Sequence, residues 1–117
     1  MREPKYVYRA KLKRVVDGDT IDLRIDTGFH LEVTQRIRFN GLDTPEIFGV
    51  RKDTSEYKRG IKAKEYVERR FQDNDGKCII ETYNIGKYGR WVADIFLADS
   101  ELSLNQELLD KGLAKKM

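Results

Sequence analysis

Hydrophobic and polar residues alternate along three consecutive stretches in the first third of the chain. The apolar positions are Tyr6, Tyr8, Ala10 and Leu12, then Ile21, Leu23 and Ile25, then Phe29, Leu31, Val33, Ile37 and Phe39. A period of two is typical of β-strands with one buried face. Asp-Gly and Thr-Gly pairs lie between the stretches, and such pairs favour tight hairpin turns. We therefore expect a three-stranded antiparallel meander with these residues facing inward.

The hydrophobic period changes in the second half of the chain. After a polar loop, an apolar stripe with helical spacing predicts a helix from about Ser55 to about Gln72. Two more strands are expected at 77–83 and 91–97, joined by 84–89. Ser103 with Gln106 three residues later is a capping-box pattern, which predicts the start of a short second helix. Leu104, Leu108 and Leu109 would face inward from it.

The predicted order of elements is β-β-β-α-β-β-α. Five strands with a helix between the third and the fourth are the plan of the oligonucleotide/oligosaccharide-binding (OB) barrel. The expected fold class is therefore mainly β with α, a five-stranded OB-fold barrel. With 117 residues, the chain is expected to form one domain over residues 1–117.

Composition excludes several classes of protein. Apolar residues make 39% of the chain and charged residues 37%, as in a globular domain with a highly charged surface. No apolar run approaches the roughly 20 residues of a membrane span. The first residues lack the apolar core of a signal peptide, so we expect a cytoplasmic protein or a secreted one trimmed of its leader. One cysteine, Cys78, and one histidine, His30, cannot supply a structural zinc site. Cys78 is expected to be buried, and His30 to face solvent.

Charge is unevenly distributed, although the net charge is only +3. Residues 17–50 carry seven acids against three basic residues, and the segments on both sides are basic. An acidic pocket between basic segments suits a cation together with a polyanion. Charge alone favours the alternative that these basic side chains only solvate a strand face and a helix face.

Two short motifs concentrate the acids. "DGDT" contains Asp17 and Asp19, and "LDTPE" contains Asp43, Thr44 and Glu46. The first precedes the second strand and the other follows the third, so the meander can bring them together at one end of the barrel. Two carboxylates and a backbone carbonyl suit Ca²⁺, whereas Mg²⁺ demands stricter geometry. Glu46 would remain available as a base. Each motif taken alone is equally typical of a turn.

Two arginines extend this hypothesis. Arg38 precedes Asp43 by five residues, and Arg90 ends the "KYGR" segment at the start of the last strand. A guanidinium group binds phosphate through paired N–H donors. With a divalent ion and a free carboxylate, two arginines form a phosphodiesterase site. Alternatively, each arginine pairs with a nearby acid such as Asp22 or Glu32.

Four segments resemble the thermonuclease (staphylococcal nuclease-like) domain family in order and spacing. They are "VVDGDTIDL", "RIRFNGLDTPE", "KYGRWVADI" and "GLAK". The resemblance implies the same barrel and a calcium-dependent endonuclease. Such an enzyme cleaves DNA and RNA at the bond to the 5′-oxygen and leaves 3′-phosphates. The expected partners are DNA and RNA, single-stranded or locally open, with no membrane involved, and the protein is expected to be a monomer.

The resemblance also implies roles for individual residues. It makes Asp19 and Asp43 side-chain ligands of Ca²⁺, and Thr44 a ligand through its backbone carbonyl. It implies that Arg38 and Arg90 bind the phosphate and act in catalysis. It implies that Glu46 is the general base or positions the attacking water. Lys87 and Tyr88 are implied to contact a nucleotide's terminal phosphate.

The chain departs from the family pattern after "GLAK", where the family's third helix is expected to be absent. The basic loop at 49–60 also differs from the family pattern. One alternative function is a catalytically weak or inactive nucleic-acid-binding OB module, because related domains keep the barrel and lose the catalytic groups. Another is a generic barrel that stacks bases on Tyr57, Tyr88 or Trp91. Tyr57 and Trp91 are expected to be core residues instead.

Overall fold

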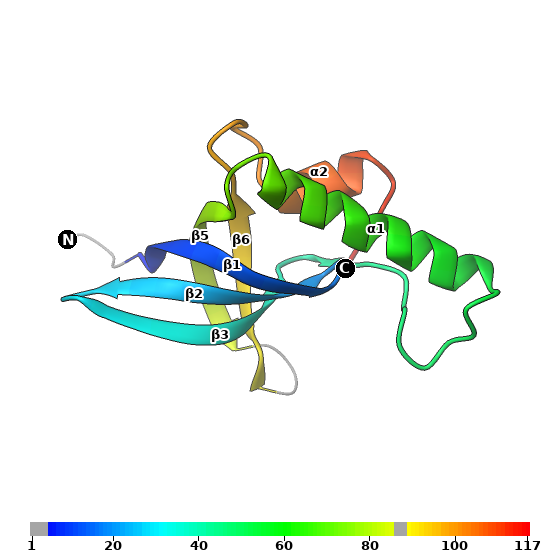
Figure 1. Cartoon of the computed structure of the whole chain (residues 1–117), viewed down its shortest axis with the longest axis horizontal. Coiled ribbons are helices and arrows are strands. Elements are labelled where there is room, and N and C mark those ends of the chain that lie inside the picture. Colours follow the sequence, from blue (N-terminus) through cyan, green and yellow to red (C-terminus); the bar gives the residue numbers. More distant parts are fainter. Residues whose placement is uncertain (1–4, 86–88) are drawn as a thin grey trace.

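The strands of the described residues form a closed barrel in the order β1-β2-β3-β6-β5. The computed structural model describes residues 5–85 and 89–117. The barrel strands are β1 (Val7–Asp17), β2 (Thr20–Gly28), β3 (Leu31–Phe39), β5 (Lys77–Ile85) and β6 (Trp91–Phe96). Neighbouring strands are antiparallel except β3 and β6, which are parallel. The predicted meander and the OB-like five-stranded barrel are both confirmed (Figure 1).

Two helices pack together at one end of the barrel (Figure 1). α1 spans Ser55–Gln72, and Thr54 caps it by accepting a hydrogen bond from the Tyr57 N–H. α2 spans Leu104–Asp110, and the Ser103 side chain accepts from the Gln106 N–H, as the capping pattern predicts. No helix in the part of the chain that the structure describes is long and apolar enough to span a bilayer.

The core contains the inward faces of β1, β2, β5 and β6, the end of β3 with Ile37 and Phe39, and the apolar faces of both helices. Among its fully buried members are Ile21, Leu23, Val67, Phe71, Ile80, Ile95, Leu104 and Leu108. Cys78 is buried among them as expected, and burial raises the pKa of its thiol to about 12. His30 is exposed at the β2–β3 turn, also as expected.

The outer half of the β2–β3 hairpin is not part of the core, so the expectation that all five apolar residues of the third stretch face inward is wrong. Phe29 is 94% exposed, and Leu31 and Val33 are also exposed. The reason is that β3 pairs with β6 only through residues 37–39, and the remainder of the hairpin extends beyond the barrel. Trp91, expected in the core, is also exposed, because it lies at the first residue of β6.

Two short strands join the C-terminal end of the chain to the segment after β3. β4 (Leu42–Asp43) pairs in an antiparallel manner with β7 (Lys115–Lys116). The Met117 N–H donates a further hydrogen bond to the Gly41 carbonyl at 3.0 Å. The sequence pattern does not indicate this pairing, which holds the Asp43 backbone from the C-terminal side.

A network centred on Arg70 connects the two helices. The Arg70 guanidinium donates two hydrogen bonds of 2.7 Å to Asp99 and two, of 2.8 and 3.2 Å, to Glu107. The Tyr66 hydroxyl donates to the same Glu107 carboxylate at 2.8 Å. The hydrogen bonds from Arg70 lower the pKa of Asp99 to about 2. Burial raises the pKa of Glu107, but the hydrogen bonds from Arg70 and Tyr66 outweigh burial, so this pKa is lowered overall.

We expect Arg70→Met to lower the free energy of unfolding by about 2 kcal/mol or more, because it leaves the mostly buried Glu107 carboxylate without its cation. The two lowered carboxyl pKa values stabilise the wild type fully above about pH 5, and this contribution is lost as pH falls from there toward 2. Urea denaturation at pH 7 and at pH 3 measures both effects. A variant as stable and as acid-sensitive as the wild type would contradict the role of the network.

Candidate active site

A polar cavity of about 470 Å³ lies where β1 ends and β2 begins. Its walls include Arg14, Asp17, Asp19, Arg36, Arg38, Glu46, Phe48 and Arg90. Asp19 precedes β2 by one residue, Arg38 lies near the end of β3, and Arg90 precedes β6 by one residue. The fold therefore brings four of the predicted site residues to one cavity from three separate parts of the chain.

Arg38 connects the two predicted acidic motifs. Its guanidinium forms an ion pair with Asp19, with 3.5 Å between Nη1 and Oδ2, and a second ion pair with Asp43. The Asp19 side chain is mostly buried, whereas that of Asp43 is half exposed. Asp43 is thus at the rim, in contact with Arg38, and does not line the cavity itself.

The suggested ion pairs of the arginines with Asp22 or Glu32 do not involve Arg38. Asp22 accepts two hydrogen bonds from Arg36, at 2.9 and 3.2 Å. Glu32 forms an ion pair with Arg24 at 3.6 Å. Arg38 therefore does form salt bridges, but with Asp19 and Asp43 of the two acidic motifs.

Asp19 is a buried carboxylate with several donors. It accepts hydrogen bonds from the Thr44 N–H at 3.1 Å and the Thr20 hydroxyl at 3.0 Å. Burial raises its pKa, but hydrogen bonds from Asp17, Thr44 and Thr20 and the charge of Arg38 lower it overall. Burial and the Asp19 carboxylate raise the pKa of Asp17 to about 7, so Asp17 keeps its proton at mildly acidic pH, where Asp19 is already ionised.

Two glycines allow α1 to approach the acidic motifs closely. A Cβ at Gly18 would lie 2.7 Å from the Ala63 Cβ and 2.9 Å from the Thr44 Cγ2. A Cβ at Gly60 would lie 2.6 Å from the Pro45 carbonyl oxygen. Both contacts are too close for any side chain. The absence of these side chains lets the helix surface support the backbone on both sides of the cavity.

Three charged or aromatic residues of the cavity wall, Arg14, Arg36 and Phe48, were not predicted from the sequence. Arg36 shares a strand face with Arg38, two residues away, so the alternation of β3 could have indicated it. Arg14 reaches the wall because the β1–β2 pairing shifts between Leu12 and Arg14, which no sequence period indicates. Phe48 lies in an irregular segment and is 57% exposed.

The predicted substrate contacts Lys87 and Tyr88 lie outside the described residues. The described residues contain no group of three or more His, Cys, Asp or Glu side chains arranged to hold a metal ion. The predicted donors, the carboxylates of Asp19 and Asp43 and the carbonyl of Thr44, are nevertheless hard oxygen ligands of the type that Ca²⁺ prefers. Their chemistry fits this ion, although Arg38 contacts both carboxylates in this structure.

Comparison with known proteins identifies several relatives. The chain is 31% identical over 127 residues to an uncharacterized protein of Methanocaldococcus jannaschii, covering 92% of this chain and 58% of that protein. It is 31% identical to Endonuclease YhcR of Bacillus subtilis (92% of this chain, 9% of that protein). It is also 31% identical to Thermonuclease of Staphylococcus intermedius (89% of this chain, 56% of that protein). The chain thus spans less than two thirds of each of these relatives.

A family model described as staphylococcal nuclease homologue matches residues 36–117. This range contains Arg38, the "LDTPE" motif, α1 and Arg90, and it covers more than half of the chain. The match agrees with the closed barrel and with the nuclease names of two of the relatives. The chain therefore belongs to the staphylococcal nuclease homologue family.

Proposed function

We propose that the protein is a calcium-dependent endonuclease that hydrolyses phosphodiester bonds of DNA and RNA and leaves 3′-phosphates. The observation that carries this proposal is that Asp19, Arg38, Glu46 and Arg90 line one cavity. Two guanidinium groups and two carboxylates in a shared cavity supply binding of a phosphate, a ligand for a cation and a base. Membership of the family and the names of two relatives support nuclease activity in general.

In this mechanism Arg38 and Arg90 donate hydrogen bonds to the non-bridging oxygens of the scissile phosphate. Their paired N–H donors stabilise the negative charge that accumulates on these oxygens as phosphorus becomes five-coordinate. Glu46 accepts a proton from the attacking water, or orients it. The electron pair of the breaking P–O bond then passes to the 5′-oxygen, which takes up a proton and leaves.

We assign Asp19, Asp43 and the Thr44 carbonyl as the groups that would hold Ca²⁺. When bound, this ion would add positive charge near the phosphate and stabilise the same developing negative charge. Asp19 is prepared for this role because its pKa is lowered, so its carboxylate stays ionised at neutral pH. Asp43 is half exposed at the rim, so its side chain has room to exchange Arg38 for another cation.

The proposed substrates are single-stranded or locally open nucleic acids, because the phosphate must enter the cavity with its leaving group in line with the attacking water. Lys87 and Tyr88 are proposed to contact a terminal phosphate of the substrate, as in the family. The protein is proposed to act as a monomer.

We expect Ca²⁺ to be required for hydrolysis of a labelled trinucleotide by this chain. Excess EGTA should abolish product formation. Asp19→Asn should lower kcat/KM by at least about 10²-fold, since it removes a charged ligand and a partner of Arg38. Chromatography of the products checks both results and identifies the terminal phosphate.

The matched control is Asp22→Asn, which removes a carboxylate three residues further along, in β2, where it accepts two hydrogen bonds from Arg36. It should leave kcat/KM within a few-fold of the wild type. Undiminished hydrolysis in EGTA would exclude the role of calcium. Oligonucleotide binding without any hydrolysis would favour the inactive binding module.

A further inference from the structure

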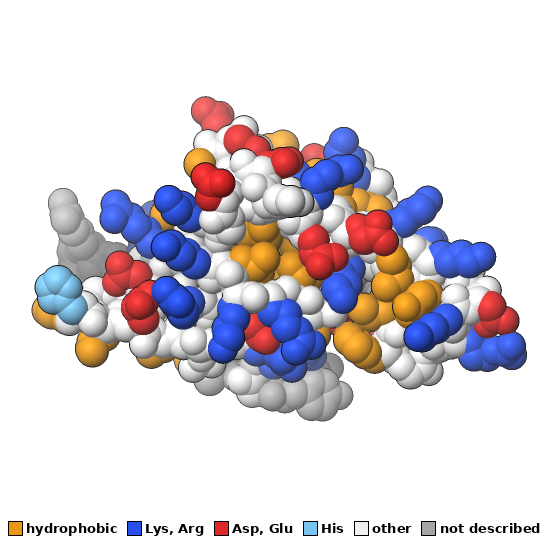
Figure 2. All heavy atoms as spheres, viewed as in Figure 1, with side chains coloured by type: hydrophobic (Ala, Val, Ile, Leu, Met, Phe, Trp, Pro, Cys, Tyr) orange, Lys and Arg blue, Asp and Glu red, His pale blue; other side chains and the backbone are white. Residues whose placement is uncertain are grey.

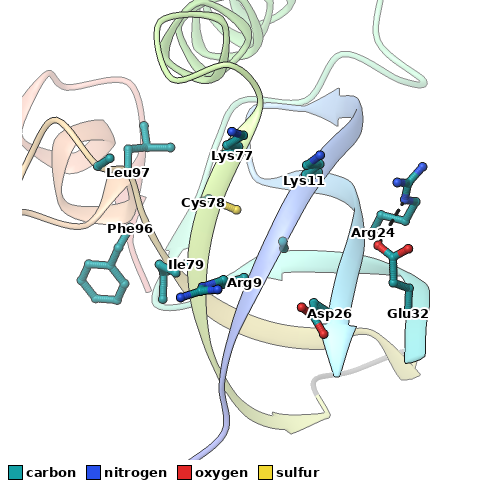
Figure 3. A pocket seen from close by; sticks show the side chains of 12 residues that line it. Arg9, Lys11, Arg24, Asp26, Glu32, Lys77, Cys78, Ile79, Phe96 and Leu97 are labelled. Atoms are coloured by element: carbon teal, nitrogen blue, oxygen red, sulfur yellow. Dashed lines mark ion pairs between the residues drawn. The ribbon is translucent and has the colours of Figure 1, made fainter. Parts of the chain in front are cut away.

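A second groove lies at the other end of β1, away from the proposed active site. Its volume is about 490 Å³, and its walls include residues from β1, β2, β5 and β6. The cations of the groove are Arg9, Lys11, Arg24 and Lys77. Its apolar surface comes from the exposed Ile79 and the partly buried Phe96. Figure 3 shows Lys11 and Lys77 on neighbouring strands and Arg9 beside Ile79.

Three of these cations lie in one row across the sheet. Lys11 on β1 is directly opposite Arg24 on β2 and directly opposite Lys77 on β5. Like charges at directly opposite positions destabilise a sheet. The row therefore carries an energetic cost that the fold itself does not require, and an anion lying along the row would remove it.

Few acids of the protein neutralise this row. Arg24 forms an ion pair with Glu32, in which both side chains are about half exposed. Asp26 also lines the groove. Arg9, Lys11 and Lys77 form no ion pair with any residue in the described ranges. Asp26 lies directly opposite Arg9, so it offsets part of the charge of Arg9. The groove has four cations against two acids, and Lys11 and Lys77 are the cations most available to an external anion.

Basic residues continue from this groove toward the proposed active site. Lys13 and Arg14 follow Lys11 on β1, and Arg14 lines the active-site cavity. Figure 2 shows lysine and arginine side chains following one another over strands β1 and β2. Lys11 and Asp17 are separated by six residues of strand, or about 20 Å. At about 3.4 Å per stacked nucleotide, this distance corresponds to roughly six nucleotides.

We propose that this groove, called here the basic groove and defined by Arg9, Lys11, Arg24 and Lys77, binds the phosphate backbone of a single-stranded polynucleotide whose scissile phosphate lies in the active-site cavity. The inference rests on the proposed function and deepens it. Ile79 and Phe96 provide apolar surface against which unpaired bases can pack. The protein would consequently bind long substrates more tightly than short ones.

The test compares binding of a trinucleotide with binding of an oligothymidylate of about 20 nucleotides, which is long enough to reach the groove. Binding is measured by fluorescence anisotropy over a range of salt concentrations. Lys11→Gln/Lys77→Gln should weaken binding of the long probe about tenfold. It should also reduce the magnitude of the slope of log K against log salt by about 1.4, since two phosphate contacts are lost. The trinucleotide is too short to reach the groove, so the variant and the wild type should bind it with equal affinity.

The matched control is Lys62→Gln/Lys111→Gln, which removes the same charge from exposed positions outside the groove. Equal weakening by both double variants would overturn the proposal, because net charge alone would then explain it. An unchanged affinity and salt slope in Lys11→Gln/Lys77→Gln would also overturn it. The melting temperature of that variant should equal or exceed the wild-type value because the like-charge row is relieved, and a loss of stability would contradict this account of the row.

Failure of the proposed function is detected separately. Hydrolysis of the trinucleotide by the wild type tests the active site without the groove. Hydrolysis combined with unaltered binding of the long probe by the variant would reject only the basic groove. Binding of the long probe that depends on Lys11 and Lys77 would support the groove even if the trinucleotide were not hydrolysed.

Discussion

Arg38→Lys is expected to lower kcat/KM for trinucleotide hydrolysis by at least about 10²–10³-fold, the loss typical of removing one preorganised donor to a developing oxyanion. Lysine keeps the positive charge but cannot reproduce the planar fork of the guanidinium. In this structure that fork contacts Asp19 and Asp43 at once. The substitution therefore removes a phosphate donor and also loosens the two carboxylates assigned to the ion. Steady-state kinetics at saturating Ca²⁺ measure the effect.

Arg36→Lys is the matched control for this prediction. Arg36 lines the same cavity and lies two residues away on the same strand, but its guanidinium is bound through two hydrogen bonds to Asp22. Its loss should change kcat/KM by less than about tenfold, as for a surface ion pair. Equal effects of the two substitutions would show that Arg38 acts only as one more cation of the cavity wall. Circular dichroism of both variants checks that the barrel is intact.

The regular elements of the fold could be predicted because their signals are local. The apolar stripe and the polar loop before it placed the first helix at Ser55–Gln72, which is also its observed extent. The Ser103 cap was predicted from two residues and is observed. By contrast, β4 and β7 contain two residues each and pair across more than 70 positions of sequence. Strands this short have no period, so only the tertiary structure specifies them.

Convergence of the site residues could be expected from the meander, since "DGDT" and "LDTPE" had to lie at the ends of neighbouring strands. The individual contacts between these residues could not be predicted from the sequence. The strand register decides which ion pairs form. It places Arg38 against Asp19 and Asp43, and it places Arg36 against Asp22. The exposure of Phe29 likewise depends on how far β6 accompanies β3, which is a property of two distant segments. Period-two alternation identifies a face of a strand but not the length over which it is covered.

Gly60→Ala is expected to reduce both activity and stability, although alanine is the better helix former by about 1 kcal/mol. The new Cβ would lie 2.5 Å from the Ile47 Cγ2 and 2.6 Å from the Pro45 carbonyl oxygen. The second contact is with backbone, so the segment that carries Glu46 has to move by about 1 Å. Misplacement by this distance is expected to lower kcat/KM by about 10²-fold. Overpacking costs about 1–3 kcal/mol, so the net free energy of unfolding should also fall.

Two further variants separate these effects. Glu65→Ala changes an exposed position of the same helix and should be neutral in activity, because it tests helix propensity alone. Adding Ile47→Ala to Gly60→Ala removes the contact with the methyl group but not the contact with the Pro45 carbonyl. The double variant should therefore remain nearly as inactive as Gly60→Ala. Wild-type kcat/KM in Gly60→Ala would mean that the position of Glu46 does not depend on its support by α1, and Glu46 would then lose its assignment as the group that acts on water.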